Sequence, residues 1–268
     1  MAKIIAHEWH RTRGLLALIF GIAIGLTVMS AGMLKLNLAG INALGFITGL
    51  IAVGAFLPAV QIALGVDYWF ANYRRTGYFT QTLPIKGSTQ YWAKLFYGIV
   101  VCLVALVLNA GTLLLWLWAS QKITGLNLRA LKEAWAQLHP MLSWEVWFIG
   151  ILILAMFACG MLIQLYFVAS VGSEEPLNRL GFGGPVVVYV IYYFSYQALT
   201  LISIFLIPWG INNRADGTIG LVRESFFTGF PNVSAEAMPI GFVPVILITY
   251  IFLIWRTVYS WNRKVSLA

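Results

Sequence analysis

The residues of this chain that come nearest to a catalytic pattern are His7, Glu8 and His10. In the zinc pattern H-E-x-x-H, two histidines four residues apart lie on one face of a helix and bind the metal. Here the two histidines are three residues apart, and the sequence offers no evident third ligand. We therefore interpret them as side chains near the membrane surface and predict no metal site.

A second pattern runs from Glu174 to Arg179 and resembles the EExxxR motif of a family of intramembrane proteases related to prenyl endopeptidases. In that family, catalysis also requires histidines on later helices. The three histidines of this chain, His7, His10 and His139, all precede the motif. A charged turn between two spans explains the motif more simply, and an intramembrane enzyme is kept as an alternative interpretation.

Two glycine-containing segments invite comparison with nucleotide-binding loops. Residues 86–89, KGST, lack the first glycine and the residue order of the phosphate-binding pattern G-x-x-x-x-G-K-[ST]. Residues 181–184, GFGG, lack the strand–helix context and the final glycine of a dinucleotide fingerprint. We therefore expect no catalytic residue, no ATP hydrolysis and no cofactor on this chain.

The composition indicates which kind of secondary structure must position any functional residues. The 268 residues are 60% hydrophobic and 10% charged, with a mean hydropathy of +0.84, whereas soluble domains carry about 25% charged residues. A helix needs about 20 apolar residues to cross a bilayer, and six charge-free runs reach that length. Their apolar residues are continuous rather than alternating, which excludes a membrane β-barrel. We predict an all-α membrane protein, one domain over residues 1–268, with six transmembrane helices near 14–34, 38–65, 95–119, 146–171, 184–207 and 238–257.

The distribution of Lys and Arg predicts the orientation. These residues concentrate in the N-terminal segment, in 67–94, at Arg179 and in the C-terminal segment, which places both termini in the cytoplasm. The net charge of +8 reflects this bias and does not indicate nucleic-acid binding, which requires a basic face on a soluble element.

Three connecting segments carry apolar residues. Residues 1–13 combine basic and apolar side chains, which favours an N-terminal interfacial helix in contact with membrane lipids. The segment 121–144 places four apolar residues on one helical face and predicts an external interfacial helix that ends near Pro140. The segment 208–239 is either a plain external loop or short helices that return to the membrane. The four residues of that face are Leu128, Leu131, Trp135 and Leu138.

The interiors of the predicted spans hold neutral polar residues and small residues. Because the charge-free runs contain no ionisable side chain, proton coupling through a carboxylate at the bilayer midplane is not expected. Gln61, Asn109, Gln164 and Gln197 either hydrogen-bond between helices or line a substrate path. Small residues four apart allow close helix approach, within the bundle or between subunits. The two pairs of this kind are Gly21 with Gly25 and Gly45 with Gly49.

The segment 67–94, DYWFANYRRTGYFTQTLPIKGSTQYWAK, is the largest polar interruption on the basic side. This segment resembles the cytoplasmic loop of the permeases of bacterial type 2 ATP-binding-cassette (ABC) exporters in four features. These are a basic pair, the sequence Gly-Tyr-Phe-Thr, the sequence Thr-Leu-Pro and the entry into the third span. The N-terminal sequence HEWHRTR is similar to the basic first helix of the same permeases. The order of spans, with the largest external loop between the fifth and sixth, is also similar.

The resemblance implies a permease subunit in the bacterial cytoplasmic (inner) membrane that forms the substrate path of an exporter. It implies separate ABC ATPase subunits, which bind ATP and Mg, and a second permease chain, identical or homologous. The segment 67–94 then contains a coupling helix between spans two and three. The coupling residues implied by position are Arg74, Arg75, Tyr78, Phe79, Thr80, Leu83 and Pro84.

Two other functions remain open from the sequence. A basic loop with aromatic residues also fits a surface that rests on anionic lipid headgroups. A membrane scaffold or immunity protein that binds a partner without transport would show the same spans. The transported substrate, whether peptide, lipid or drug, is not indicated.

Overall fold

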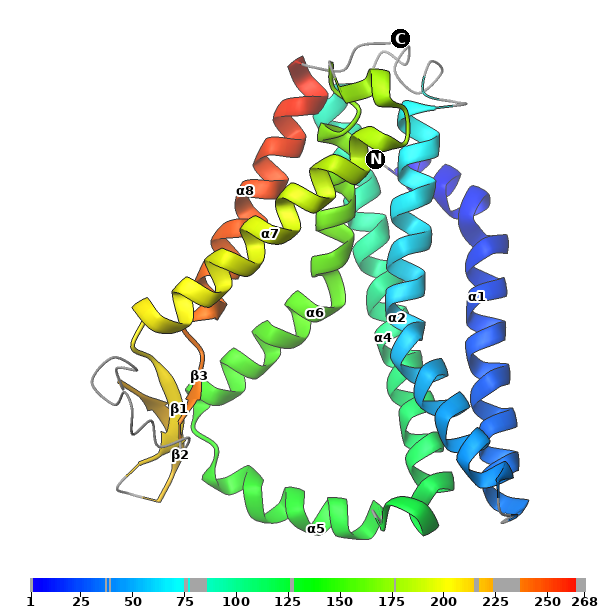
Figure 1. Cartoon of the computed structure of the whole chain (residues 1–268), viewed down its shortest axis with the longest axis vertical. Helices are drawn as coiled ribbons and strands as arrows, with labels where there is room; N and C mark the ends of the chain where they lie inside the picture. The colour runs from blue at the N-terminus through cyan, green and yellow to red at the C-terminus, as the bar shows by residue number, and fades with distance from the viewer. Residues whose placement is uncertain are drawn as a thin grey trace. The chain divides into compact units, whose positions relative to one another are not determined.

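The structure, a computed structural model, describes residues 2–36, 38, 40–74, 77, 86–125, 128–175, 177–214, 217–223 and 237–263. Within these residues, six helices are long and apolar enough to cross a membrane, as the hydropathy pattern predicts (Figure 1). This confirms the predicted all-α fold class, and the length and composition of the six helices suggest a multi-pass membrane protein. The six helices are α1 (Ala2–Leu36), α2 (Ile41–Tyr73), α4 (Gly87–Thr124), α6 (Trp144–Val171), α7 (Gly183–Leu206) and α8 (Phe242–Arg263).

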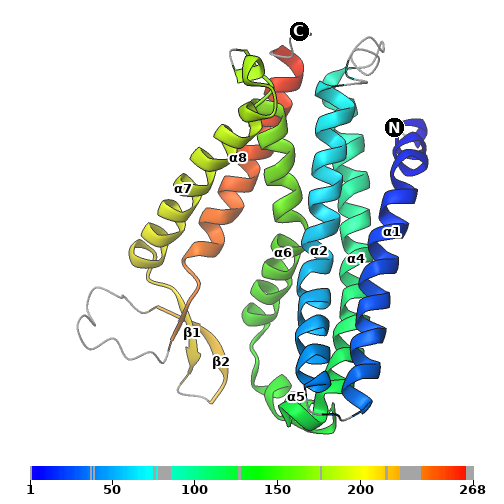
Figure 2. The same ribbon diagram turned by 45° about the vertical axis from the view of Figure 1, so that its right-hand side comes forward.

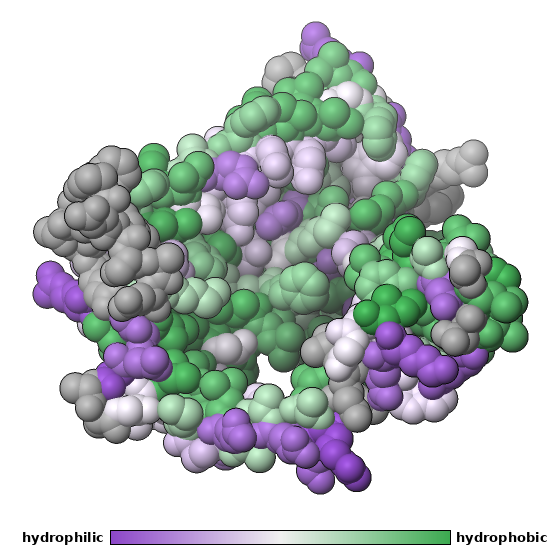
Figure 3. Space-filling model, turned by 60° about the horizontal axis from the view of Figure 1, so that its bottom comes forward, coloured by the Kyte–Doolittle hydropathy of each residue, from purple (hydrophilic) through white to green (hydrophobic). Residues whose placement is uncertain are grey.

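The surface of these helices is consistent with a lipid environment. Hydrophobic side chains cover much of the face seen in Figure 3. Many large apolar residues point outward, including Val107, Ile191 and Ile251, each more than 60% exposed. In water an apolar surface of this extent would drive association, whereas in a bilayer it contacts lipid tails.

The first three helices are longer than the predicted spans. They have 35, 33 and 38 residues, while about 20 residues cross the hydrocarbon core. Residues 2–13 continue into α1 without a break, so the expected N-terminal interfacial helix is not a separate element. α2 reaches Tyr73 and continues through Pro58, and α4 begins at Gly87. Helix therefore occupies both ends of the segment 67–94, and the connection between α2 and α4 is only residues 74–86.

The chain packs as two compact units. The first contains α1, α2, α4 and residues 161–166 of α6. Its three long helices lie side by side (Figure 2). The interior of this unit is lined by residues that are at most 2% exposed, among them Phe56, Leu57, Val60 and Tyr91. Compact packing units need not be separate folding domains, so the expectation of one domain stays a prediction.

Glycines of α2 and α4 allow close helix contacts in the first unit. A Cβ on Gly65 would lie 2.8 Å from Leu165, and one on Gly98 would lie 2.6 Å from Leu162. Both leucines belong to α6, so α2 and α4 present their glycines where α6 approaches. The absence of a side chain is what permits this approach.

The predicted small-residue pairs differ in their surroundings. A Cβ on Gly45 would lie 2.8 Å from Met33, and one on Gly49 would overlap Trp116, so this pair packs inside the unit. For Gly21 and Gly25, the described residues place no atom within 4 Å of an added Cβ. That face of α1 makes no close contact within the described part of the chain.

The second unit contains residues 135–160 and 167–266, and so most of α6 together with α7 and α8.

The amphipathic helix predicted near Pro140 is confirmed as α5 (Leu128–Leu138), followed by the short helix η1 (His139–Met141). Leu131, Trp135 and Leu138 are 42–50% exposed. A further short helix, η2 (Leu177–Leu180), precedes α7. The position of α5 at a membrane interface stays a prediction.

The segment 208–239 is neither of the two forms considered from the sequence, as far as it is described. It contains a three-stranded antiparallel sheet in the order β2-β1-β3. Arg214 follows β1 and donates a hydrogen bond to Glu145 at the start of α6, at 2.8 Å, which attaches the sheet to that helix. The strands are β1 (Gly210–Asn213), β2 (Ile219–Val222) and β3 (Met238–Pro239).

The glycine contacts can be tested within one helix. Gly65→Ala would press a methyl group against Leu165, and overpacking of this kind costs about 1–3 kcal/mol. Gly54→Ala is the matched control, because no described atom lies within 4 Å of its added Cβ. We expect a lower melting temperature in detergent for Gly65→Ala only, measured by fluorescence-detected unfolding. Equal melting temperatures would contradict this packing.

Candidate functional site

Four charged side chains from three helices meet near the α2–α4 connection. Lys94 of α4 donates to Glu8 of α1 at 2.7 Å. Arg11, one turn after Glu8, contacts Glu8 at 2.5 Å and reaches Asp67 of α2 through two nitrogens, at 2.5 and 3.1 Å. We call these four residues the ion cluster. With two acids and two bases, the ion cluster is electrically neutral.

Burial makes the pairing in the ion cluster obligatory. Glu8 is 4% exposed and Lys94 is 3% exposed, so neither charge is solvated by water. An isolated buried charge costs several kcal/mol, and this cost is offset only when an opposite charge is in contact. The side chains of Arg11 and Asp67 are 28% and 22% exposed, so this pair closes the ion cluster toward the outside.

Polar and aromatic contacts surround the ion cluster on the same helices. Thr12 of α1 shares a short hydrogen bond with Tyr97 of α4, at 2.5 Å between the two hydroxyl oxygens. Tyr68, next to Asp67, stacks on Tyr166 of α6 with ring centroids 3.9 Å apart. α1, α2 and α4 are therefore fixed to one another at this level, and the 161–166 segment joins them.

The ion cluster lies at the base of the α2–α4 connection. Asp67 is six residues before the end of α2, and Lys94 is seven residues after the start of α4. At 3.6 residues per turn, each is about two helical turns from the connection. A force applied to residues 74–86 would reach these charges through two short, continuous helical segments.

The sequence does not predict the ion cluster. Glu8 lies within the segment that approaches a zinc pattern, and Asp67 and Lys94 lie at the two ends of the polar segment 67–94. The spacing of Glu8 and Arg11, three residues apart, places them on one helical face and was the available signal. The contacts to Asp67 and Lys94 join residues 56 and 86 positions apart, which a local pattern does not reveal.

Most of the residues implied as ATPase contacts lie outside the described residues: Arg75, Tyr78, Phe79, Thr80, Leu83 and Pro84. Arg74 is described. It is exposed, and its guanidinium lies 4.9 Å from the centre of the Trp69 ring. This cation–π contact holds the first basic residue of the connection against the end of α2.

The four amides considered for a substrate path are on four different helices. Gln61 is buried in α2, and Asn109 of α4 accepts a hydrogen bond from Thr112. Gln164 lies in α6, within the segment that belongs to the first unit, and Gln197 is exposed on α7. Their role in a path stays a prediction.

The two patterns that resemble catalytic motifs have structural partners. Glu8 is paired in the ion cluster, while His7 and His10 are exposed. Glu174 is 6% exposed and accepts two hydrogen bonds from Arg256 of α8, at 2.7 and 2.8 Å. This bidentate pair ties the segment that follows α6 to α8.

Comparisons of this chain with protein-family models, with curated proteins and with solved structures find no match. A function is therefore inferred from the residues of the chain and their geometry. The most informative feature is the buried ion cluster, about two helical turns from the ends of α2 and α4 that the connection joins.

The ion cluster can be tested by neutralising one partner. Glu8→Gln leaves Lys94 buried without a full counter-charge, and breaking a buried pair costs about 3–5 kcal/mol. We expect a clear loss of thermal stability in detergent, measured from the size-exclusion elution profile after heating. Glu175→Gln is the matched control, since Glu175 is exposed. Replacing Glu8 and Lys94 together by leucine should recover much of the stability. Equal stability of Glu8→Gln and Glu175→Gln would contradict the pairing.

Proposed function

We propose that this chain is the membrane-spanning subunit of an ATP-driven exporter, powered by a separate ABC ATPase that binds ATP and Mg. The ATPase contacts residues 74–86, the connection between α2 and α4. A second permease chain, identical or homologous, completes the transporter in the bacterial cytoplasmic membrane. The observation that carries the proposal is the ion cluster, which joins both helices of this connection to α1.

The position of the ion cluster gives the connection a mechanical role. Asp67 and Lys94 come from the two helices that the connection joins, and both bind α1 through Arg11 and Glu8. Separating Arg11 from Asp67, or Lys94 from Glu8, would leave a buried charge without its partner, which costs free energy. The ends of α1, α2 and α4 therefore move together when the connection is displaced. Movement of an ATPase against residues 74–86 would then shift α1, α2 and α4 as one body.

The chemistry of the connection suits a protein partner. Its sequence from Arg74 to Lys86 carries three basic residues and no acidic residue. It also contains one tyrosine, one phenylalanine and a Leu-Pro pair. Aromatic anchors with a charged rim are common in protein interfaces. An ATPase surface with an apolar groove and acidic edges would be complementary to it.

The alternative of an intramembrane enzyme is less well supported. Its motif depends on Glu174, whose carboxylate is occupied by Arg256. A scaffold without transport remains compatible with the same helices, and it differs from the proposal in one property. A scaffold would not change the rate of ATP hydrolysis by its partner.

The ATPase contact can be tested by co-purification from a bacterial membrane in mild detergent. We expect the unmodified chain to recover an ABC ATPase, and Tyr78→Ala with Leu83→Ala to lose it, because truncation of interface anchors typically costs more than 1 kcal/mol each. Leu180→Ala with Phe182→Ala is the matched control. Both residues are apolar and exposed in the connection between α6 and α7. Recovery of the same ATPase by both double variants would refute the proposed contact, as would its absence from the unmodified chain.

A further inference from the structure

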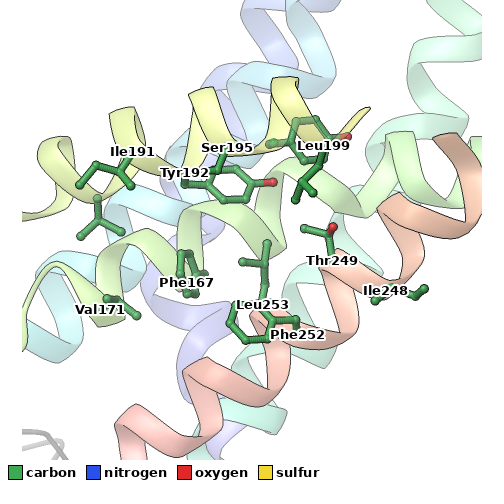
Figure 4. A pocket seen from close by; sticks show the side chains of 12 residues that line it. Phe167, Val171, Ile191, Tyr192, Ser195, Leu199, Ile248, Thr249, Phe252 and Leu253 are labelled. Carbon is green, nitrogen blue, oxygen red and sulfur yellow. The ribbon is translucent and has the colours of Figure 1, made fainter. Parts of the chain in front are cut away.

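A cavity of about 590 Å³ lies among α6, α7 and α8 of the second unit (Figure 4). This volume falls in the range of about 300–1,000 Å³ that is typical of small-molecule sites. The described residues around it include no charged side chain and none of the four amides considered for a substrate path. The lining comprises Phe167, Val171, Val188, Ile191, Tyr192, Ser195, Tyr196, Leu199, Ile248, Thr249, Phe252 and Leu253.

Four side chains of the lining carry a hydroxyl group: Tyr192, Ser195, Tyr196 and Thr249. Thr249 donates to the carbonyl of Val245 at 2.8 Å, and Tyr196 is hydrogen-bonded to Tyr250. The hydroxyl oxygen of Tyr192 is buried and has no partner among the described residues. A buried polar group without a partner costs about 1–3 kcal/mol. Tyr192 therefore holds an unused buried donor at the wall of a cavity whose other lining side chains are mostly apolar.

The surroundings of Tyr192 direct this donor. Its ring lies between Phe167 and Tyr196, with centroid distances of 6.0 and 5.6 Å. In Figure 4 it extends from α7 toward the side chains of α8. Because the oxygen is buried, an acceptor would need a rotation of the ring or of its neighbours to reach it.

The edge of the cavity faces lipid in a membrane-spanning chain. Ile191, Ile248 and Phe252 line it and are 63%, 66% and 51% exposed. These side chains belong to the apolar surface that contacts lipid tails. A ligand that enters from the bilayer must itself be lipophilic, and a charged molecule would lose its hydration without gaining a counter-charge.

We infer that this cavity binds an uncharged, lipophilic molecule of drug size that carries one hydrogen-bond acceptor, a ketone or an ester carbonyl, for Tyr192. The apolar walls supply the affinity, and Tyr192 selects molecules with an acceptor over plain hydrocarbon. If the proposed transport function is correct, this is the class of molecule that the exporter carries. The binding itself does not depend on that function.

The test uses the purified chain in lipid nanodiscs, without any ATPase, and a hexyl-substituted benzophenone as the probe. This probe is uncharged, and its ketone is a hydrogen-bond acceptor. Under near-ultraviolet light the ketone abstracts a hydrogen atom from a nearby C–H bond and the two radicals join. Peptide mass spectrometry then locates the labelled residues. We expect labelling that saturates with probe concentration and concentrates on the cavity residues of α6, α7 and α8.

Two matched pairs of variants separate binding from partition into lipid. Leu199→Trp fills the cavity and should abolish the saturable labelling, whereas Leu201→Trp should not, since Leu201 is exposed and outside the lining. Tyr192→Phe should raise the half-saturating concentration about two- to tenfold, as expected for one hydrogen bond. Tyr193→Phe, at the adjacent exposed tyrosine, should leave it unchanged.

Three results would overturn the inference. Non-saturating labelling spread evenly over outward-facing residues would mean that the probe only dissolves in the bilayer. Saturable labelling that survives Leu199→Trp would place the site elsewhere. Equal labelling of Tyr192→Phe and the unmodified chain would remove the selection for an acceptor. Because no ATPase is present, none of these results bears on the ATPase contact, and loss of that contact would leave cavity labelling unchanged.

Discussion

Charges removed from water must be paired, and this constraint organises the end of the first unit. Glu8 and Lys94 are almost fully buried, so α1 and α4 are held in the register that keeps them in contact. Arg11 extends the same requirement to Asp67 on α2. Apolar helices can slide past one another in lipid at little cost, because tails and side chains are equally apolar. A neutral group of four buried and half-buried charges removes that freedom.

The glycine contacts act together with this constraint. Gly65 and Gly98 allow α6 to approach α2 and α4, and the stack of Tyr68 on Tyr166 lies at the same contact. Close approach increases the van der Waals contact on which helix association in membranes depends. The result is a packed group of helices whose ends are joined by residues 74–86. In the proposed function, this arrangement turns a local contact with an ATPase into a movement of whole helices.

The elements that the sequence predicts well are those with a local physical cause. Long apolar runs identify the six spans, and the face containing Leu131, Trp135 and Leu138 identifies α5, because bilayer thickness and helical periodicity each act within one segment. The sequence does not predict the sheet formed by β1, β2 and β3, because these strands are too short to give an alternating pattern. It does not predict the ion cluster, because the partners become neighbours only after α1, α2 and α4 pack. The same reason separates Gly45, which packs inside the first unit, from Gly21, which does not.

In the proposed function, the ion cluster transmits the action of a bound ATPase to the membrane helices. The most direct measurement compares ATPase binding and ATP turnover in nanodiscs containing the unmodified chain, Asp67→Asn, or Glu145→Gln. Asp67→Asn removes the ion pair between Arg11 and α2, while Arg11 still contacts Glu8. Glu145→Gln is the control, because it weakens an ion pair of similar exposure in the second unit, the pair of Glu145 with Arg214. We expect that Asp67→Asn still binds the ATPase but no longer stimulates ATP turnover, whereas Glu145→Gln binds the ATPase and stimulates turnover like the unmodified chain. Full stimulation of turnover by folded Asp67→Asn would refute this role of the ion cluster.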